Sequence, residues 1–366
     1  MLAKTTPRPW SAFMVALALA ACTATASPPG ASPSGATASA ASRSTTPAPP
    51  SATASGGPTI SASVAPRVDG QIVFEDAGQD FRFTQIWIEN ADGSNVRRLV
   101  SDTFTDNSAS LSPDGKTIAF YQLADPALPG TIMLVKVDGS GLHELDTGSR
   151  AKGCDAAPEG DAWSPDGSRI VFVRFCFDSS GTFIEAGIWT IKIDGTDAQQ
   201  VTSNRPASHA EDHRVGWSPD GRSLVFERLD LSVSPERAAI FTIGVDGNHL
   251  RQVTPWKLDG NDPDWSPEGS LIAFNASAEP SPTQNIYTIR ADGTGLRKLT
   301  SYDKAGQATY HPSWSPDGTQ ILFSHSPSTD GWGDFFIMDR SGSNQHAVAK
   351  TPLHENHGEW GSSPMP

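Results

Sequence analysis

The sequence lacks several features that would place it in a common functional class. Lys and Arg together number 27 against 41 Asp and Glu in 366 residues, which gives a formal charge of −14 at pH 7. No basic run extends beyond Arg97-Arg98, so the chain offers no electrostatic surface for nucleic acid. No Gly-x-Ser-x-Gly segment occurs either, which argues against a serine hydrolase with that nucleophile motif.

The N-terminal apolar run is too short to be a permanent transmembrane helix. It extends from Phe13 to Ala21, whereas a bilayer span needs roughly 20 residues. The run follows the cations Lys4 and Arg8 and ends next to Cys22, which is the arrangement of a secretion signal. Residues 1–21 are therefore predicted to be a signal peptide.

The end of this signal, Leu19-Ala20-Ala21-Cys22, resembles the lipobox of bacterial lipoproteins. By that resemblance, cleavage before Cys22 leaves this residue as the lipidated N-terminus. Each buried acyl methylene contributes ~0.8 kcal/mol, so two or three chains would hold the protein on a membrane. The alternative is an ordinary secreted protein. With lipidation, the expected location is the outer face of the cytoplasmic membrane, or the periplasm or outer membrane.

Cysteine is scarce, with three residues in the chain. If Cys22 carries lipid, Cys154 and Cys176 remain as one even pair in an oxidising compartment. We expect a disulfide between them, worth roughly 3 kcal/mol by loop entropy.

Residues 22–66 are almost wholly Ala, Ser, Thr, Pro and Gly, with Arg43 as the single charge. Such a composition has no apolar periodicity to offset the entropy of ordering. This segment is predicted to be a disordered tether in front of a folded domain at 67–366.

A five-residue segment, Trp-Ser-Pro-Asp-Gly with small variations, recurs through that domain. Its copies lie 48 to 54 residues apart, which is the length of a four-stranded propeller blade. Ser, Pro and Gly at the first, second and fourth turn positions favour a type I turn between two strands. The copies begin at Leu111, Trp163, Trp217, Trp265 and Trp314.

Third strands recur six times, as β-branched and aromatic segments that end in Asp-Gly or Ser-Gly. They begin at Ile86, Ile132, Ile188, Ile240, Ile286 and Phe335. Only five complete turns exist, so the first blade lacks an inner strand, and the segment around Trp360 should supply it. The predicted fold class is all-β: a six-bladed β-propeller of four-stranded antiparallel blades, closed by the C-terminal strand completing blade 1.

The repeats resemble the β-propeller repeats of the TolB type, which are relatives of WD repeats. The resemblance rests on the recurring turn and on the segment from Asp292 to Thr300, and it covers residues 67–366. It implies the fold. TolB itself, by this resemblance, works in a cell-envelope complex with a peptidoglycan-associated lipoprotein. TolB carries an α/β domain before its propeller, whereas this chain has the predicted tether there.

Inner strands line the axis of a propeller, so the residues just before each inner-strand Trp should converge on the central channel. We expect a binding site at the channel mouth; solvated loop entrances are the alternative. No catalytic residue, metal ligand or cofactor is assigned, although a divalent cation held by His213, His311 and His357 stays open. The expected binding residues are Asp106, Asp161, His213, Asp262, Asp264, His311, His357 and Glu359.

The sequence thus predicts an exported, membrane-anchored, monomeric propeller that binds a protein or peptide of the cell envelope. It predicts no nucleic-acid partner. The alternative function is a propeller enzyme, a hydrolase or lyase that uses His and acidic residues of the channel mouth, with or without a divalent metal.

Overall fold

The computed structural model describes a single unit that falls within residues 68–366. The described residues are 70–76, 83–100, 103–124, 129–149, 154–157, 162–178, 180, 182–205, 208–277, 283–304, 307–326, 333–348, 353 and 355–361. Cys22 and Asp161 lie outside these ranges. Within them, no helix has the length and apolar character needed to cross a membrane.

The first three blades contain four antiparallel strands each. Blade 1 is built from β1 (Gln71–Asp76), β2 (Gln85–Asn90), β3 (Arg97–Arg98) and β24 (Glu355–Gly361). Blade 2 is built from β4 (Thr105–Leu111), β5 (Thr117–Leu123), β6 (Thr131–Lys136) and β7 (His143–Leu145). Blade 3 is built from β8 (Cys154–Ala157), β9 (Arg169–Phe177), β10 (Phe183–Lys192) and β11 (Gln199–Gln200).

The last three blades repeat this order, and a short 3-10 helix, η3 (Trp256–Leu258), joins blades 4 and 5. Blade 4 is built from β12 (Ala210–Trp217), β13 (Ser223–Asp230), β14 (Arg237–Gly244) and β15 (Arg251–Gln252). Blade 5 is built from β16 (Gly260–Trp265), β17 (Ile272–Ala276), β18 (Asn285–Ile289) and β19 (Arg297–Lys298). Blade 6 is built from β20 (Ala308–Trp314), β21 (Gln320–Ser326), β22 (Asp334–Asp339) and β23 (His346–Ala347).

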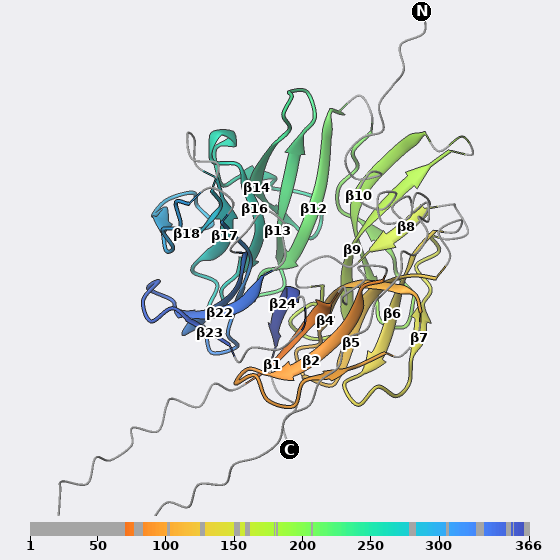
Figure 1. The fold of residues 1–366 in the computed structure, drawn as a ribbon. Coiled ribbons are helices and arrows are strands. Elements are labelled where there is room, and N and C mark those ends of the chain that lie inside the picture. Colours follow the sequence, from red (N-terminus) through yellow and green to blue (C-terminus); the bar gives the residue numbers. More distant parts are fainter. Residues whose placement is uncertain are drawn as a thin grey trace, which may run out of the picture. The chain divides into compact units, whose positions relative to one another are not determined.

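The C-terminal strand closes the ring, which confirms the predicted fold class. Strand β24 pairs antiparallel with β1, placing Trp360 opposite Ile72. Figure 1 shows the dark blue β24 close to the orange β1, although more than 270 residues separate them in the chain. At this seam the rings of Phe74 and Phe335 meet edge to face, with centroids 5.6 Å apart. Blade 6 therefore packs on blade 1 through side chains of both.

Apolar side chains between neighbouring blades form the core. Among the described residues they fall into six clusters, one for each pair of adjacent blades. Each second strand contributes one fully buried phenylalanine: Phe74, Phe120, Phe172, Phe226, Phe274 and Phe323. Since no blade has a complete core of its own, each one depends on both neighbours for burial.

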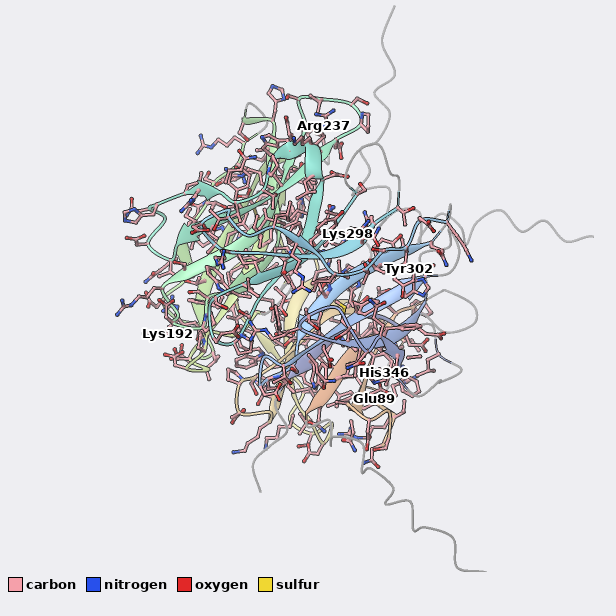
Figure 2. The ribbon with its side chains drawn as sticks, turned by 90° about the vertical axis from the view of Figure 1, so that its left-hand side faces the viewer. Glu89, Lys192, Arg237, Lys298, Tyr302 and His346 are labelled. Carbon is pink, nitrogen blue, oxygen red and sulfur yellow. A yellow bond between two sulfur atoms is a disulfide. The ribbon has the colours of Figure 1, made fainter. Side chains whose placement is uncertain are left out.

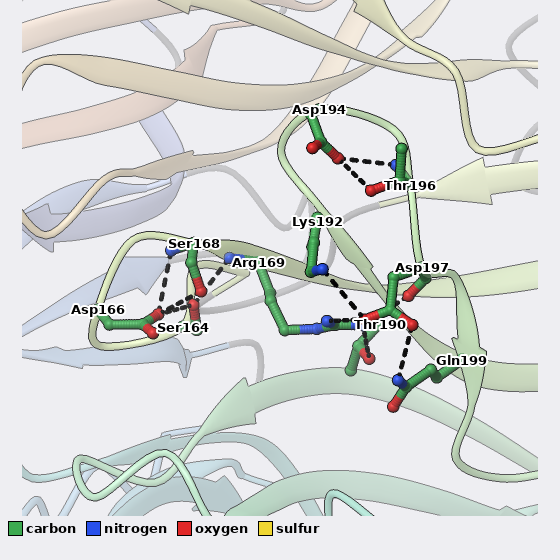
Figure 3. Close-up of polar contacts among 10 residues, drawn as sticks. All are labelled: Ser164, Asp166, Ser168, Arg169, Thr190, Lys192, Asp194, Thr196, Asp197 and Gln199. Carbon is green, nitrogen blue, oxygen red and sulfur yellow. Dashed lines mark hydrogen bonds and ion pairs between the residues drawn. The ribbon is translucent and has the colours of Figure 1, made fainter.

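The recurring turns are held by their own side chains, as Figure 3 shows for blade 3. Ser164 donates its hydroxyl to Asp166 at 2.6 Å, and the backbone N–H of Ser168 donates to the same carboxylate oxygen. These bonds lower the pKa of Asp166 to about 2, and the hydrogen bond from the Ser164 hydroxyl contributes most. In the next turn, Asp194 likewise accepts hydrogen bonds from the backbone N–H and the hydroxyl of Thr196. The repeated motif is thus explained by chain reversal.

Two details differ from the strand pattern of the sequence. In blade 3 the inner strand β8 is Cys154–Ala157, and the described residue Trp163 adds an isolated bridge to Ile170 before the turn. The outermost strands have two or three residues. They lie at the periphery and pair on one side only, so few hydrogen bonds extend them.

Cys154 and Cys176 face each other on β8 and β9 and form a disulfide with an S–S distance of 2.10 Å. The bridge ties the start of an inner strand to the far end of its neighbour. It therefore fixes the edge of blade 3 on the side of the ring where inner strands begin.

Deleting residues 355–366 should destabilise the whole propeller, because it removes the inner strand of blade 1 and the buried Trp360. We expect a loss of at least about 5 kcal/mol of unfolding free energy, since loss of a buried Trp side chain alone costs roughly 3–5 kcal/mol. Chemical denaturation followed by tryptophan fluorescence measures this. Deleting only residues 362–366 is the control. Equal stability of the two truncated proteins would contradict the closure.

Candidate axial binding site

Five inner strands carry a β-bulge at the same place, three residues before the Trp or Leu that begins the turn motif. The bulged residue has a left-handed backbone conformation in each, with φ between 46° and 53°. These residues are Ser108, Arg214, Asp262, His311 and His357. Asp and His adopt this conformation more readily than most residues, and bulges commonly redirect a side chain. The equivalent residue of blade 3 is Gly160, outside the described ranges.

The five bulge residues line one pocket with a volume of about 70 Å³. They come from blades 1, 2, 4, 5 and 6, so the pocket lies where the inner strands meet. Pro263, Pro312 and Gly358, each directly after a bulge, complete much of its wall. Five predicted site residues line this pocket: Asp262, His311 and His357 as bulge residues, with Asp264 and Glu359 beside them.

Asp262 lies at the centre of the charged contacts in this pocket. One carboxylate oxygen is 3.2 Å from Nε of Arg214, and the other is 3.1 Å from Nδ1 of His311. Burial alone would raise the pKa of Asp262, but His311 and Arg214 outweigh it and hold this pKa well below its usual range. Asp262 is therefore ionised at neutral pH, with both oxygens engaged by cationic or N–H groups.

His357 forms a second imidazole–carboxylate pair beside the first. Its Nδ1 is 3.1 Å from Oε2 of Glu75, and its ring lies against that of His311 with centroids 3.6 Å apart. Burial, followed by the charges of His311 and Arg214, lowers the pKa of His357 well below 6.5. The contacts thus run without interruption from Arg214 through Asp262, His311 and His357 to Glu75.

Two buried glutamates accept hydrogen bonds from the backbone of bulge residues. Glu75 on β1 accepts the backbone N–H of Ser108 at 2.5 Å, and Glu227 on β13 accepts that of Asp262 at 3.2 Å. They occupy equivalent positions, each directly after the buried Phe of the second strand. Burial is the main reason that the pKa of each rises to about 7; the charge of Asp262 adds to it for Glu227.

Asp264 and Glu359 line the same pocket, but their hydrogen bonds hold neighbouring blades together. Asp264 accepts the backbone N–H of Trp314 at 2.6 Å, and Glu359 accepts that of Leu111 at 3.0 Å. Ser313, at the corresponding position of blade 6, accepts the N–H of Trp360. In these three blades, the residue just before the Trp or Leu thus accepts a backbone hydrogen bond from the inner strand of the next blade.

Asp106 and His213 lie outside the pocket lining. Asp106 is fully buried and accepts an amide hydrogen of Gln122 at 3.0 Å. His213 is also fully buried, with its ring stacked on Phe175 and its Nε2 3.5 Å from Glu211. Each lies before the bulge of its strand and is covered by neighbouring side chains. Asp161 lies outside the described ranges.

Metal binding finds no geometric support in the described part of the chain, where no group of three or more His, Cys, Asp or Glu side chains is arranged to hold an ion. His213 is not among the residues that line the pocket with His311 and His357. The two pocket imidazoles already direct Nδ1 to carboxylates.

Arg214, Ser108, Glu75 and Glu227 belong to this arrangement but were missed in the sequence. Aligning the repeats on their Trp would have placed Arg214 and Ser108 in register with His311 and His357. The glutamates carry a different signal, because each is a charged residue that directly follows three apolar residues of its strand.

A family model described as the TolB beta propeller domain matches residues 142–363. The chain belongs to the TolB β-propeller family. Among solved structures, TolB from Acinetobacter baumannii is similar with a TM-score of 0.62 and 17% identity, covering 80% of this chain and 66% of that one. A putative TolB from Agrobacterium tumefaciens gives a TM-score of 0.55 and 20% identity over 81% of this chain and 92% of that one. At these identities the likeness shows the fold.

Curated relatives match over part of their length. An uncharacterized protein of Agrobacterium fabrum is 26% identical over 151 residues, which are 41% of this chain and 45% of that protein. A probable dipeptidyl-peptidase 5 of Arthroderma benhamiae is 29% identical over 210 residues, 52% of this chain and 26% of the peptidase. The chain therefore spans less than half the length of these relatives.

Replacing Glu227 by Gln should stabilise the fold more at pH 8 than at pH 5. The folded chain keeps the Glu227 proton up to about pH 7, whereas an exposed Glu releases it near 4.5, so stability from this group falls as pH rises between those values. The amide can still accept the Asp262 N–H. We expect the gain to grow by about 2 kcal/mol from pH 5 to pH 8.

Chemical denaturation of the parent and the variant at both pH values tests this. His357 contributes an opposite pH dependence to both proteins, so it cancels in the difference between their unfolding free energies. The same replacement at the exposed Glu236 is the matched control. A Glu227→Gln gain of equal size at pH 5 and pH 8 would refute the raised pKa.

Proposed function

We propose that the protein is an exported, membrane-anchored propeller that binds a protein or peptide of the cell envelope through the axial pocket. The observation that carries the proposal is the pocket itself, lined by bulge residues of five blades. Bulges re-aim side chains, and here the re-aimed groups are charged or polar in every described case. Membership of the TolB family supports a place in the envelope.

The size of the pocket favours a macromolecular partner. Its volume of about 70 Å³ is far below the roughly 300–1,000 Å³ of pockets that enclose small organic ligands. Such a space holds one side chain or chain end while the rest of the partner rests on the surrounding surface.

A photo-crosslinking residue in place of Tyr310 should capture the partner. Tyr310 is half-buried and its ring lies 6.1 Å from that of His311, so p-benzoylphenylalanine at this position would reach the pocket mouth. We expect a discrete adduct when the full chain is irradiated with envelope extract, and its loss when Asp262→Asn is added. Mass spectrometry of the adduct identifies the partner.

The matched control is the same replacement at Tyr302. This half-buried tyrosine follows the outer strand β19, whose Lys298 is labelled with it in Figure 2. It stacks on His325 of blade 6 and is not among the residues that line the pocket. Adducts of equal yield from both positions, or none from Tyr310, would contradict the proposal.

The membrane anchor rests on the sequence of the first 22 residues and has its own test. Replacing Cys22 by Ser should move the protein from the membrane fraction to the soluble fraction, because two or three acyl chains supply the binding energy. Fractionation with immunoblotting, and mass spectrometry of the N-terminal peptide, measure this. A parent protein whose N-terminal peptide carries no acyl mass would overturn the anchor.

Acid–base catalysis is the second candidate function, and one observation favours it. Asp262 with His311 and Glu75 with His357 are carboxylate–imidazole pairs on a pocket wall, the geometry that orients an imidazole as a general base. Turnover of a glycan or lactone by the parent and its loss in His311→Asn would support it.

A further inference from the structure

Nε2 of His357, a residue that lines the pocket, has a hydrogen-bonding capacity that the described residues do not use. It is buried and has no hydrogen-bond partner. The other ring nitrogen, Nδ1, lies 3.1 Å from Glu75 Oε2. An imidazole that donates its Nδ1–H to a carboxylate keeps a lone pair on Nε2. In this tautomer, Nε2 is therefore a hydrogen-bond acceptor without a donor among the described residues.

The surroundings of His357 keep the ring in this neutral form. Burial disfavours the imidazolium, and the positive charges of His311 and Arg214 disfavour it further, so its pKa lies well below 6.5. Asp262 acts in the opposite sense, but its two oxygens are engaged by Arg214 and His311.

The same charges discriminate between classes of ligand. An ammonium or guanidinium group at Nε2 would meet the positive charge of Arg214, while both Asp262 oxygens are occupied and Glu75 is paired with Nδ1. A carboxylate would face the lone pair of Nε2 and the ionised Asp262. A neutral O–H or N–H group meets neither penalty and satisfies a buried acceptor, whose desolvation otherwise costs roughly 1–3 kcal/mol.

We propose that the axial pocket receives an uncharged hydrogen-bond donor, the side-chain hydroxyl or amide of a partner polypeptide, which donates to Nε2 of His357. The proposal rests on the proposed function and names the kind of residue that enters the pocket. A volume of about 70 Å³ accommodates a group of this size. Buried acceptors give strong discrimination, because a group without the matching donor leaves them unsatisfied.

In the test, full-length protein is labelled with ¹⁵N-histidine and followed by NMR. It is titrated with four probes, the N-acetyl N-methylamides of asparagine, alanine, lysine and aspartate. The work is done at pH 8, where Glu75, with a pKa of about 7, is ionised. His357→Asn assigns the resonance, since Asn tolerates the left-handed backbone there. We expect the asparagine probe to shift the Nε2 resonance and to bind at least about fivefold more tightly than the alanine probe. The lysine and aspartate probes should bind no better than alanine.

Glu75→Gln provides a second readout that does not require loss of folding. The new amide can present its NH₂ group to Nδ1 of His357, which moves the ring proton to Nε2 and turns the acceptor into a donor. The preference for asparagine over alanine should disappear, while the exposed Glu236→Gln retains it. Melting temperatures of the variants verify that each is folded.

The outcomes separate this inference from the proposed function. If Tyr310 crosslinks a partner but the lysine, aspartate or alanine probe binds as tightly as asparagine, the neutral-donor inference is wrong and the binding function stands. If the asparagine probe binds selectively but no envelope adduct forms, the preference of the pocket for an uncharged donor stands and the envelope-binding function fails. Retention of the asparagine preference in Glu75→Gln would also overturn the inference.

Discussion

The left-handed residue of each inner-strand bulge is the constraint on which the site depends. A regular strand alternates its side chains between the two faces of the blade, where neighbouring blades cover them. One extra residue breaks this alternation and turns a single side chain toward the axis. Because five blades do so at the same position, Arg214, Asp262, His311 and His357 join in one chain of contacts with Glu75 behind them.

Closure of the ring supports this arrangement, because His357 belongs to the last strand and Glu75 to the first. Their pairing exists only when β24 completes blade 1. Glu359, two residues after His357, accepts the N–H of Leu111 in blade 2, so the closing strand also fixes its other neighbour. Stability and the axial site are therefore coupled: the carboxylates that line the pocket include two, Asp264 and Glu359, whose hydrogen bonds assemble the blades.

The architecture could be predicted from the sequence because local turn chemistry repeats, and Ser-Pro-Asp-Gly with a following β-branched strand specifies a hairpin at each copy. The site could be predicted only in part. His311, His357 and Asp262 were found by their proximity to the Trp, but the same argument selected His213 and Asp106, which are fully buried and do not line the pocket. Proximity does not reveal which residue is bulged. Glu75 and Glu227 were missed because their position becomes meaningful only when the next blade offers a backbone N–H.

The central claim is that residues from separate blades share one electrostatic site at the axis. It is tested most directly by the pKa of His357, measured by NMR titration in the parent and in Arg214→Asn, a substitution that keeps a residue tolerant of the left-handed backbone. Arg214 lies on blade 4 and His357 on blade 1, and the charge of Arg214 helps to lower that pKa. The account predicts that the pKa of His357 rises toward 6.5 in the variant; an unchanged pKa would contradict it.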